Sequence, residues 1–321
     1  MLAAQRMRDA LRGEGYALQI GPFSVNVKST LPEIAAGLTC FYQGYPSPQN
    51  EFADFHIAIE PSSVLRRWYH PQVNVDIDSI KRVKEIPASL AFTGFEWRLN
   101  YCTTVLHKHL IIDAAVVEKD GCAVILPGRP GSEKTALAAA LASGGWRLIS
   151  ADQALIPVAD PDVVTPLARP ILLEGASIDL VKAFAPEETF GPVVSDSERG
   201  SITHMRAPPD SIRRIDEPGS QKFIVFPHYH PRGKTRHAPR TKAHAFIETA
   251  QLSSNFNVLA ETGFNMLNRI ITRCDCYDFA YANLDDALSF FNGLLATDKP
   301  SSEPSPEPSP NTVTSLGGTA S

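Results

Sequence analysis

Residues 122–135 of the chain read Cys-Ala-Val-Ile-Leu-Pro-Gly-Arg-Pro-Gly-Ser-Glu-Lys-Thr. The first five of these residues form a short apolar run, which is typical of a buried strand. Gly128 and Gly131 follow within a few residues. Residues 134–143 are rich in alanine and leucine with helical spacing, until Gly144-Gly145 ends the pattern. The stretch therefore predicts a strand, a glycine-rich turn and a helix in direct succession.

Strand patterns flank this stretch on both sides. Residues 110–117 precede it as Leu-Ile-Ile-Asp-Ala-Ala-Val-Val, and the turn signature at 118–121, Glu-Lys-Asp-Gly, predicts a hairpin with the next strand. Residues 146–150, Trp-Arg-Leu-Ile-Ser, predict another strand after the helix, and Asp152 lies just past its end. Strand, glycine-rich turn, helix and strand form the context that a phosphate-binding loop requires.

The glycine-rich turn has the residue types that bind a nucleoside triphosphate. Glycines let backbone N–H groups curl round phosphate oxygens, and the following helix N-terminus adds positive charge. We expect the Lys134 ammonium to reach the β- and γ-phosphates of ATP and the Thr135 hydroxyl to bind Mg²⁺. Asp152 is expected to hold the metal or to accept a proton from an attacking hydroxyl. The predicted nucleotide-binding residues are Gly128, Arg129, Pro130, Gly131, Ser132, Glu133, Lys134 and Thr135.

Short segments spread along most of the chain match one family of proteins with such a loop. They are Phe52-Ala53-Asp54-Phe55-His56, Leu65-Arg66-Arg67-Trp68, Ala114-Ala115-Val116-Val117-Glu118, Gly145-Trp146-Arg147-Leu148-Ile149-Ser150, Arg169-Pro170-Ile171, Phe184-Ala185-Pro186-Glu187, Gly191-Pro192-Val193-Val194, Asp210-Ser211-Ile212-Arg213-Arg214 and Arg273-Cys274-Asp275-Cys276-Tyr277. From Gly21 to about Ala296, the chain resembles the HPr kinase-related family A proteins, which are relatives of HPr kinase/phosphorylase.

This resemblance implies a fold and an activity. The fold would be α/β, a P-loop core of the HPr kinase/PEP carboxykinase type with a mixed sheet, preceded by a small α+β domain. The activity would be that of a kinase, transferring phosphate from ATP to a hydroxyl of a protein or peptide. Relatives are associated with small peptide-chaperone proteins of the PqqD type, which suggests such a partner. HPr kinases form hexamers, so the resemblance also suggests a homo-oligomer.

The chain departs from the family pattern at positions that matter for catalysis. Glu133 stands where a glycine normally precedes the lysine, and Asp113 stands where HPr kinases carry a histidine. Ala151 replaces the first member of an acidic pair, and Glu174-Gly175 replaces a lysine-asparagine pair. A carboxylate ~4 Å from a phosphate oxygen costs about 4 kcal/mol at an effective dielectric constant near 20, unless it turns outward.

Two hypotheses follow from these departures. In the first, the enzyme is active, Glu133 points to solvent, Asp113 supplies the missing acidic group, and Asp152 remains the metal or base residue. In the second, the site is degenerate, and the fold survives as a nucleotide-binding or scaffold protein. Catalysis of phosphoryl transfer depends on positioned charge, so one lost acidic ligand and one added carboxylate threaten it.

Two basic stretches are further candidates. Residues 199–206 lie where the family has a mobile basic segment, so Arg206, with Arg199, could stabilise transition-state charge; the alternative is a solvated loop. The run 228–237, His-Tyr-His-Pro-Arg-Gly-Lys-Thr-Arg-His, is expected to be a solvated loop, with docking of an acidic partner as the next alternative. Arg169 could belong to the site or to a structural ion pair.

The composition fits a soluble globular protein. Of the 321 residues, 43% are hydrophobic, which is enough for a large core, and the net charge of −5 gives no reason to expect nucleic acid as a partner. No apolar run reaches the ~20 residues of a membrane span or resembles a signal peptide, so we expect a cytoplasmic protein without a membrane partner. The five cysteines have no paired spacing, which favours reduced side chains.

The patterns divide the chain into four parts. Residues 1–20 are expected to form an N-terminal helical segment, and residues 21–100 a small α+β domain. Residues 101–297 would form the P-loop kinase-like domain. Residues 298–321 are dense in proline and serine, which predicts a disordered tail. Within the second part we expect strands at 23–27, 52–59 and 73–77 and helices at 31–42 and 89–108.

Overall fold

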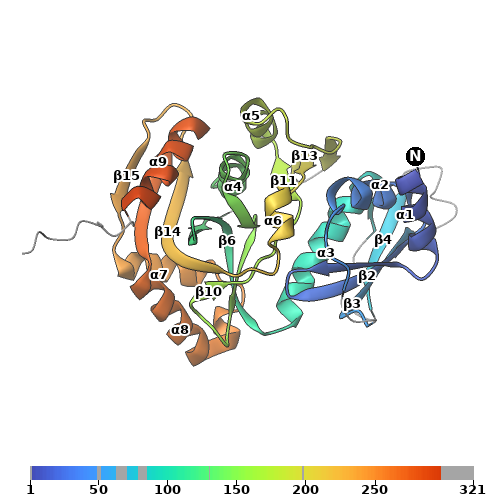
Figure 1. Ribbon diagram of the computed structural model, residues 1–321, viewed down its shortest axis with the longest axis horizontal. Helices are drawn as coiled ribbons and strands as arrows, with labels where there is room; N and C mark the ends of the chain where they lie inside the picture. Colours follow the sequence, from blue (N-terminus) through green and yellow to red (C-terminus); the bar gives the residue numbers. More distant parts are fainter. Residues whose placement is uncertain are drawn as a thin grey trace, which may run out of the picture.

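A computed structural model of the chain describes residues 2–48, 52–62, 71–78, 85–129, 131–196 and 199–297, and it has a mixed α/β architecture (Figure 1). The predicted α/β class with a mixed sheet is therefore confirmed. The proline-rich tail at 298–321, the segment Leu65-Arg66-Arg67-Trp68 and Pro130 lie outside the described residues.

The first part of the chain forms a five-stranded sheet in the order β1-β2-β3-β4-β5, in which only β2 and β3 are parallel. Three helices pack beside this sheet (Figure 1). The elements are α1 (Leu2–Arg12), β1 (Tyr16–Ile20), β2 (Phe23–Ser29), α2 (Pro32–Phe41), β3 (Phe55–Pro61), β4 (Gln72–Ile77), β5 (Ile86–Pro87), a 3-10 turn (Ala88–Leu90) and α3 (Ala91–Val105).

These elements confirm the strands and helices predicted between residues 23 and 108, but they move two boundaries. Strand β1 pairs with β2 from Tyr16↔Val27 to Ile20↔Phe23, so the segment 1–20 is not helical throughout. The boundary predicted at residue 20 falls inside this hairpin. The boundary predicted at residue 100 falls inside α3. Strand β1 forms by pairing with the next strand, β2, and the short pattern of residues 16–20 did not predict it.

The second part of the chain forms an eight-stranded mixed sheet, with its main path in the order β15-β16-β14-β7-β6-β8, and a separate three-stranded sheet in the order β11-β13-β12. The strands of the large sheet are β6 (His109–Lys119), β7 (Cys122–Pro127), β8 (Arg147–Ser150), β9 (Gln153–Pro157), β10 (Val163–Val164), β14 (Gly219–Tyr229), β15 (Arg236–Pro239) and β16 (Asp275–Tyr281). Those of the small sheet are β11 (Ile171–Glu174), β12 (Val194–Asp196) and β13 (Gly200–Met205).

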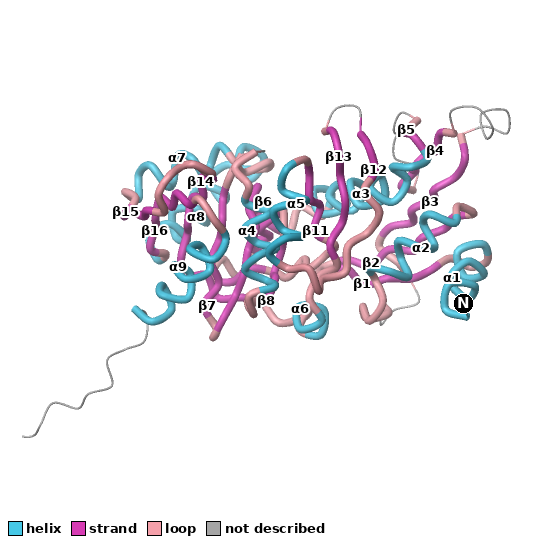
Figure 2. The backbone as a smooth tube through the Cα atoms, turned by 90° about the horizontal axis from the view of Figure 1, so that it is seen from above, coloured by secondary structure: helices cyan, strands magenta, loops and turns pink. Residues whose placement is uncertain are grey.

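Helices cover both faces of the large sheet (Figures 1 and 2). Alternate residues of β6 point to opposite faces: Ala115 and Val117 belong to the core under α4 and α9, whereas Ala114 and Val116 belong to the core under α7 and α8. The first of these cores is continuous with the core of the first sheet. The helices are α4 (Lys134–Ser143), α5 (Ala176–Phe184), α6 (Pro209–Arg213), α7 (Lys242–Gln251), α8 (Phe256–Arg273) and α9 (Leu284–Thr297).

The hairpin and helix predicted around the glycine-rich turn are confirmed. Asp120 and Gly121 join β6 to β7 with φ values of 53° and 80°, which is the geometry that an Asp-Gly pair favours in a two-residue hairpin loop. Helix α4 has the predicted bounds and ends before Gly144. Strands β7, β14 and β16 are parallel, so their carboxyl ends, at Pro127, Tyr229 and Tyr281, lie along one edge of the sheet.

The stacked aromatic rings between β16 and α9 should be a major source of stability for this edge. Phe279 is fully buried, and its ring stacks on Phe290 with centroids 4.2 Å apart and an interplanar angle of 10°. Phe279→Ala should lower the free energy of unfolding by about 3–5 kcal/mol, because the cavity cannot close completely. Phe52→Ala, at a ring that is 81% exposed, should lower it by less than ~1 kcal/mol. Urea denaturation of both variants measures this, and equal losses would contradict the packing described.

Candidate functional site

The glycine-rich turn between β7 and α4 is tightly curled. A Cβ atom at Gly128 would lie 2.3 Å from Ser132 Oγ, so any larger residue would displace the Ser132 side chain. The Ser132 amide donates a hydrogen bond of 3.0 Å to the carbonyl of Arg129, and Gly131 has a φ of 84°. The Ser132 hydroxyl oxygen is buried and has no hydrogen-bond partner in the described parts of the chain. An orphaned hydroxyl in a glycine-rich turn at a helix N-terminus fits an anion as the missing partner.

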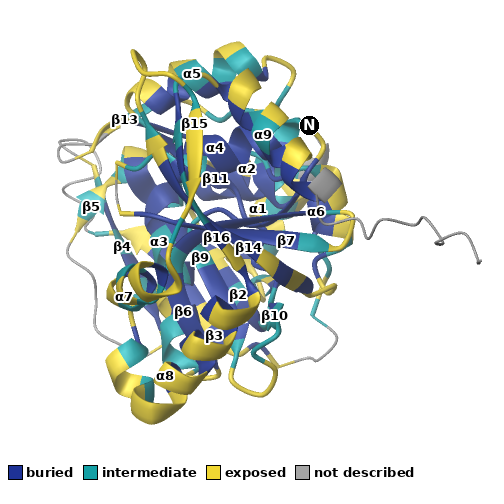
Figure 3. Cartoon of the chain, turned by 90° about the vertical axis from the view of Figure 1, so that its left-hand side faces the viewer, coloured by how far each residue is buried: buried dark blue, intermediate teal, exposed yellow. Residues whose placement is uncertain are grey.

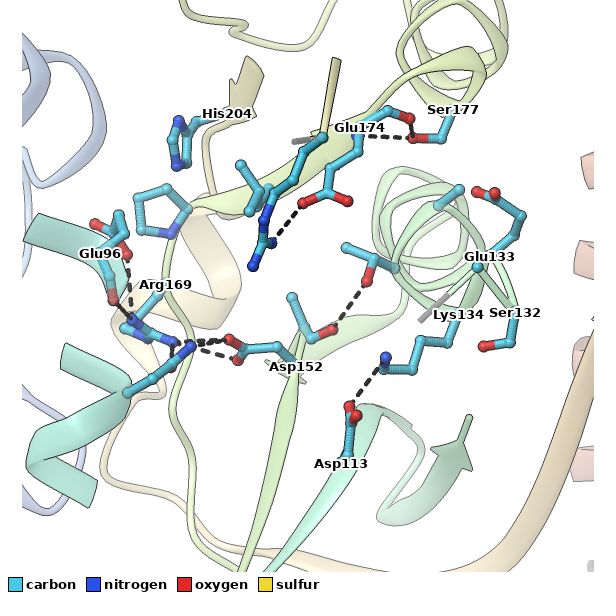
Figure 4. Close-up of a pocket in the computed structure, with 18 of the residues that line it drawn as sticks. Glu96, Asp113, Ser132, Glu133, Lys134, Asp152, Arg169, Glu174, Ser177 and His204 are labelled. Carbon is cyan, nitrogen blue, oxygen red and sulfur yellow. Dashed lines mark hydrogen bonds and ion pairs between the residues drawn. The ribbon is translucent and has the colours of Figure 1, made fainter. Parts of the chain in front are cut away.

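Lys134 is the first residue of α4 and is largely buried. Its Nζ atom lies 3.0 Å from Oδ1 of Asp113, which is on the neighbouring strand β6 (Figure 4). The Asp113 side chain is 41% exposed, so one side of this pair remains open to solvent. The fold thus brings together two predicted site residues that are 21 positions apart in sequence.

Asp152 lies just after β8, and a cluster of donors holds its carboxylate. Arg169 donates to its two oxygens over 3.3 and 3.0 Å, and the Asn100 amide donates to Oδ2 over 2.9 Å. The Thr135 hydroxyl lies 3.5 Å from the carbonyl of Ala151, which places it beside the same carboxylate. Thr135 and Asp152, the two predicted metal ligands, therefore line the same cavity.

Arg169 connects the two halves of the molecule. Its buried guanidinium donates to the Glu96 carbonyl over 3.1 Å and to Glu96 Oε2 over 3.2 Å, and it also bonds to Asn100. Tyr42 donates from its hydroxyl to the other Glu96 oxygen over 2.7 Å. Glu96 and Asn100 lie on α3, and Asp152 lies between two strands of the large sheet. The Arg169 guanidinium therefore joins α3 to the large sheet. The sequence marked Arg169 as a possible ion pair, but Glu96 and Asn100 gave no local signal that would separate them from the other polar residues of α3.

Burial shifts the pKa of Glu96 in this network and of His204, which lines the same cavity. It raises the pKa of Glu96 to about 7, against the attraction of Arg169 and the hydrogen bond from Tyr42. It lowers the pKa of His204, on β13, to about 4, and the Arg169 charge acts in the same direction. His204 therefore presents a neutral imidazole at neutral pH.

Glu133, the residue that replaces a glycine, has φ 58° and ψ 22°, in the left-handed region that favours glycine. Burial and the nearby carboxylate of Glu174 raise its pKa. Its carboxylate points away from the Lys134 ammonium and from Asp152 in Figure 4. Tyr281, from the end of β16, donates a hydrogen bond of 3.3 Å to the Glu133 carbonyl. The acidic side chain therefore does not fill the space beside the lysine.

These groups surround one cavity of about 320 Å³. Five acidic side chains and four basic ones line it, so the cavity is close to neutral without a ligand. The acidic residues are Glu96, Asp113, Glu133, Asp152 and Glu174, and the basic residues are Arg129, Lys134, Arg169 and Arg199.

Arg206, predicted as a catalytic residue, does not line this cavity. Its guanidinium donates to the carbonyl of Gln43 over 2.6 Å, because residues 200–205 form strand β13 and aim Arg206 at the first half of the molecule. A mobile segment and a solvated loop were the two alternatives predicted for 199–206, and both are wrong for the strand residues 200–205. Arg199 does line the cavity, where it pairs with Glu174 at 2.8 Å and stacks over the Trp97 ring.

Among the residues that the structure describes, no group of three or more His, Cys, Asp or Glu side chains is arranged to hold a metal ion. The described segments offer only two metal ligands at the predicted site, the Thr135 hydroxyl and the Asp152 carboxylate. They fit Mg²⁺ that is held mainly by phosphate oxygens and water, which is how this ion binds with nucleotides.

Comparison of the sequence with models of known protein families found no match, and neither did a search of curated proteins. The HPr kinase-related family therefore stays a prediction from the resemblance. Within the described part of the chain, no helix is long and apolar enough to cross a membrane.

The backbone of Glu133 leads to a stability prediction. Glu133→Gly should be more stable than Glu133→Ala by about 1 kcal/mol, because alanine must adopt the left-handed conformation and glycine does so freely. The order should reverse at Gln5, an exposed residue of helix α1, where Gln5→Ala should be the more stable of the pair. Urea denaturation of the four variants tests this. Equal free energies of unfolding for Glu133→Ala and Glu133→Gly would contradict a left-handed backbone at position 133.

The raised pKa of Glu96 predicts a pH dependence of stability. Between pH ~4.5 and pH ~7 the folded protein binds a proton at Glu96 that the unfolded chain releases, so the free energy of unfolding should fall as pH rises. The fall from this residue should be roughly 3 kcal/mol. Glu96→Gln should abolish it, whereas Glu33→Gln, at an exposed residue of α2, should not. Parallel profiles for wild type and Glu96→Gln from pH 5 to 8 would be the contrary result.

Proposed function

We propose that the chain is a P-loop nucleotide-binding protein with an HPr kinase/PEP carboxykinase-like core. Its activity would be the transfer of the γ-phosphoryl group of ATP to a hydroxyl of a protein or peptide. One observation carries the proposal: Lys134, Thr135 and Asp152 line one cavity at the N-terminus of the helix that follows a strand and a glycine-rich turn. A lysine, a hydroxyl and a carboxylate in this structural context are residue types that take part in phosphoryl transfer from ATP.

The charges of the cavity support binding of the nucleotide together with Mg²⁺. The charges of the acidic and basic side chains nearly cancel there, so a triphosphate without Mg²⁺ would meet little net electrostatic attraction. Mg²⁺, when bound, supplies the additional positive charge that offsets the phosphates. Asp152 and the Thr135 hydroxyl are the protein groups that would hold it.

Lys134 would exchange its contact with Asp113 for the β- and γ-phosphates. Asp113, released from the ammonium and 41% exposed, would then be available as a proton acceptor beside the γ-phosphate. The acceptor hydroxyl loses its proton to this carboxylate as its oxygen bonds to the γ-phosphorus, and the bond to the bridging oxygen breaks to leave ADP. Arg169 acts as a positioning residue, because it fixes the Asp152 carboxylate without lining the lysine side of the cavity (Figure 4).

A second candidate is a catalytically silent nucleotide-binding or scaffold protein. It is favoured by the fact that Lys134 and Asp152 are both paired within the chain, with Asp113 and Arg169. Ala151 leaves the site with one carboxylate where a pair is expected. In such a protein the nucleotide would bind, but no phosphoryl group would move.

Removal of the lysine ammonium tests the site directly. Lys134→Met should weaken Mg·ATP binding about 100-fold or more, because a charge-assisted contact to phosphate is lost. Lys222→Met removes an exposed ammonium from β14, which does not line the cavity, and should bind as wild type does. Isothermal titration calorimetry with and without Mg²⁺ measures both.

Incubation with ATP labelled at the γ-phosphate then separates the two candidates. A small PqqD-like protein is the first acceptor to try, on the resemblance alone. Label on the acceptor with wild type, and none with Lys134→Met, supports the kinase. Binding without transfer or hydrolysis would favour the silent nucleotide-binding protein. Absence of Mg·ATP binding by wild type would exclude both the kinase and the nucleotide-binding protein and leave only the scaffold.

A further inference from the structure

A basic loop follows strand β14 at the carboxyl edge of the large sheet. It comprises residues 230–236: residues 230–235 connect β14 to β15, and Arg236 is the first residue of β15. The amide of Gly233 donates to the His230 carbonyl over 2.8 Å to form a turn. The Thr235 hydroxyl anchors the loop by donating to Asp286, on α9, over 2.7 Å. The loop is thus attached to the fold at its middle and at its ends, although most of its residues are exposed.

Three cations of this loop are not neutralised. Arg232, Lys234 and Arg236 are all exposed, and none forms an ion pair with a described residue. Other arginines on this half of the molecule do have acidic partners: Arg240 pairs with Asp278 at 2.7 Å, and Arg269 with Asp162 at 2.6 Å. A cluster of unpaired positive charge on a chain of net charge −5 favours contact with an acidic molecule.

The loop encloses a hollow that has no acidic lining. An open cavity of about 650 Å³ lies between the three cations, His230 and Ala280 at the end of β16. Strand β15, which begins at Arg236, is the outermost strand of the sheet, and all four of its residues are exposed (Figure 3). An edge strand beside a cationic hollow suits an extended acidic peptide, since both backbone and side-chain partners are offered.

A short chain of hydrogen bonds through Tyr281 connects the basic loop to the glycine-rich turn. The amide of His230 donates to the carbonyl of Tyr281 over 2.8 Å, and the Tyr281 hydroxyl donates to the Glu133 carbonyl. Tyr229 packs on Tyr281 with ring centroids 5.2 Å apart. The loop and the turn therefore lie at the same edge of the sheet, with one tyrosine between them.

We propose that the loop 230–236 and strand β15 bind an acidic, extended segment of the protein or peptide that accepts the phosphoryl group. Only the role of this segment as phosphoryl acceptor rests on the proposed function. Its binding to the loop can be measured without ATP. Charge attraction gives the affinity, and the short connection through Tyr281 brings the bound segment toward the cavity.

Fluorescence anisotropy with a labelled peptide tests this binding. The probe is a peptide with one serine and three glutamates on each side, and its partner probe has glutamine in place of every glutamate. Arg232→Gln/Lys234→Gln/Arg236→Gln should bind the acidic peptide at least ~10-fold more weakly than wild type, and added salt should weaken wild-type binding. The glutamine peptide should bind poorly to every variant.

Arg6→Gln/Arg8→Gln/Arg12→Gln is the matched control. It changes the net charge equally through exposed arginines of α1, at the far end of the molecule (Figure 1). It should bind the acidic peptide as wild type does, and thermal unfolding should show that both triple variants are folded. Equal losses in the two triple variants, or no binding of the peptide to wild type, would overturn the proposal. So would tighter binding of a single-stranded RNA of the same charge.

Lys134→Met separates this proposal from the proposed function. It should retain peptide binding while it loses Mg·ATP. If wild type binds the peptide through the loop but does not bind Mg·ATP, the docking surface stands and the kinase does not. If wild type binds Mg·ATP but not the peptide, the proposed function stands and the docking surface does not.

Discussion

Charge compensation inside one cavity is the constraint on which this structure depends. Carboxyl groups and cations meet there from β6, α3, α4, β11, the glycine-rich turn, the segment after β8 and the segments before β11 and β13, and each is costly to bury without a partner. Arg169 satisfies Glu96 and Asp152 together, and Lys134 satisfies Asp113. The Arg169 pairs join α3 of the first part to the large sheet, so the stability of the fold and the geometry of the site share the same contacts.

The same contacts determine what a ligand must do. A polyphosphate can take the place of Asp113 beside Lys134, because that carboxylate is partly exposed. It cannot take the place of Asp152 as readily, since the Arg169 guanidinium is buried and bonds to three residues. The lysine side of the cavity is therefore the side that can exchange partners, whereas the arginine side is fixed. This division suits a site in which one carboxylate moves protons and the other holds a metal.

Local sequence patterns predicted the elements whose causes are local. The Asp120-Gly121 turn, the apolar alternation of β6 and the alanine-rich α4 appear in the structure where they were expected. Strands β1 and β13 were missed although each pairs with a strand close by in sequence, β2 and β12. The position of Arg206 was missed because its partner, Gln43, lies far away in sequence. Glu96 could not be selected from the sequence, since only the fold shows that α3 turns it toward Arg169. The backbone of Glu133 is left-handed, which explains why glycine is common at this position. The sequence alone showed only that Glu133 differs from the glycine of the family pattern.

Hydrogen exchange at the amides of residues 131–136 tests the central claim that this turn forms a cradle for polyphosphate. Mass spectrometry should show slower exchange in this segment when Mg·ATP is added, because phosphate oxygens would accept hydrogen bonds from its N–H groups. Addition of Mg²⁺ or adenosine alone should leave it unchanged. Unchanged exchange at 131–136 under saturating Mg·ATP, with slower exchange elsewhere, would show that the nucleotide binds at another place and would contradict the account.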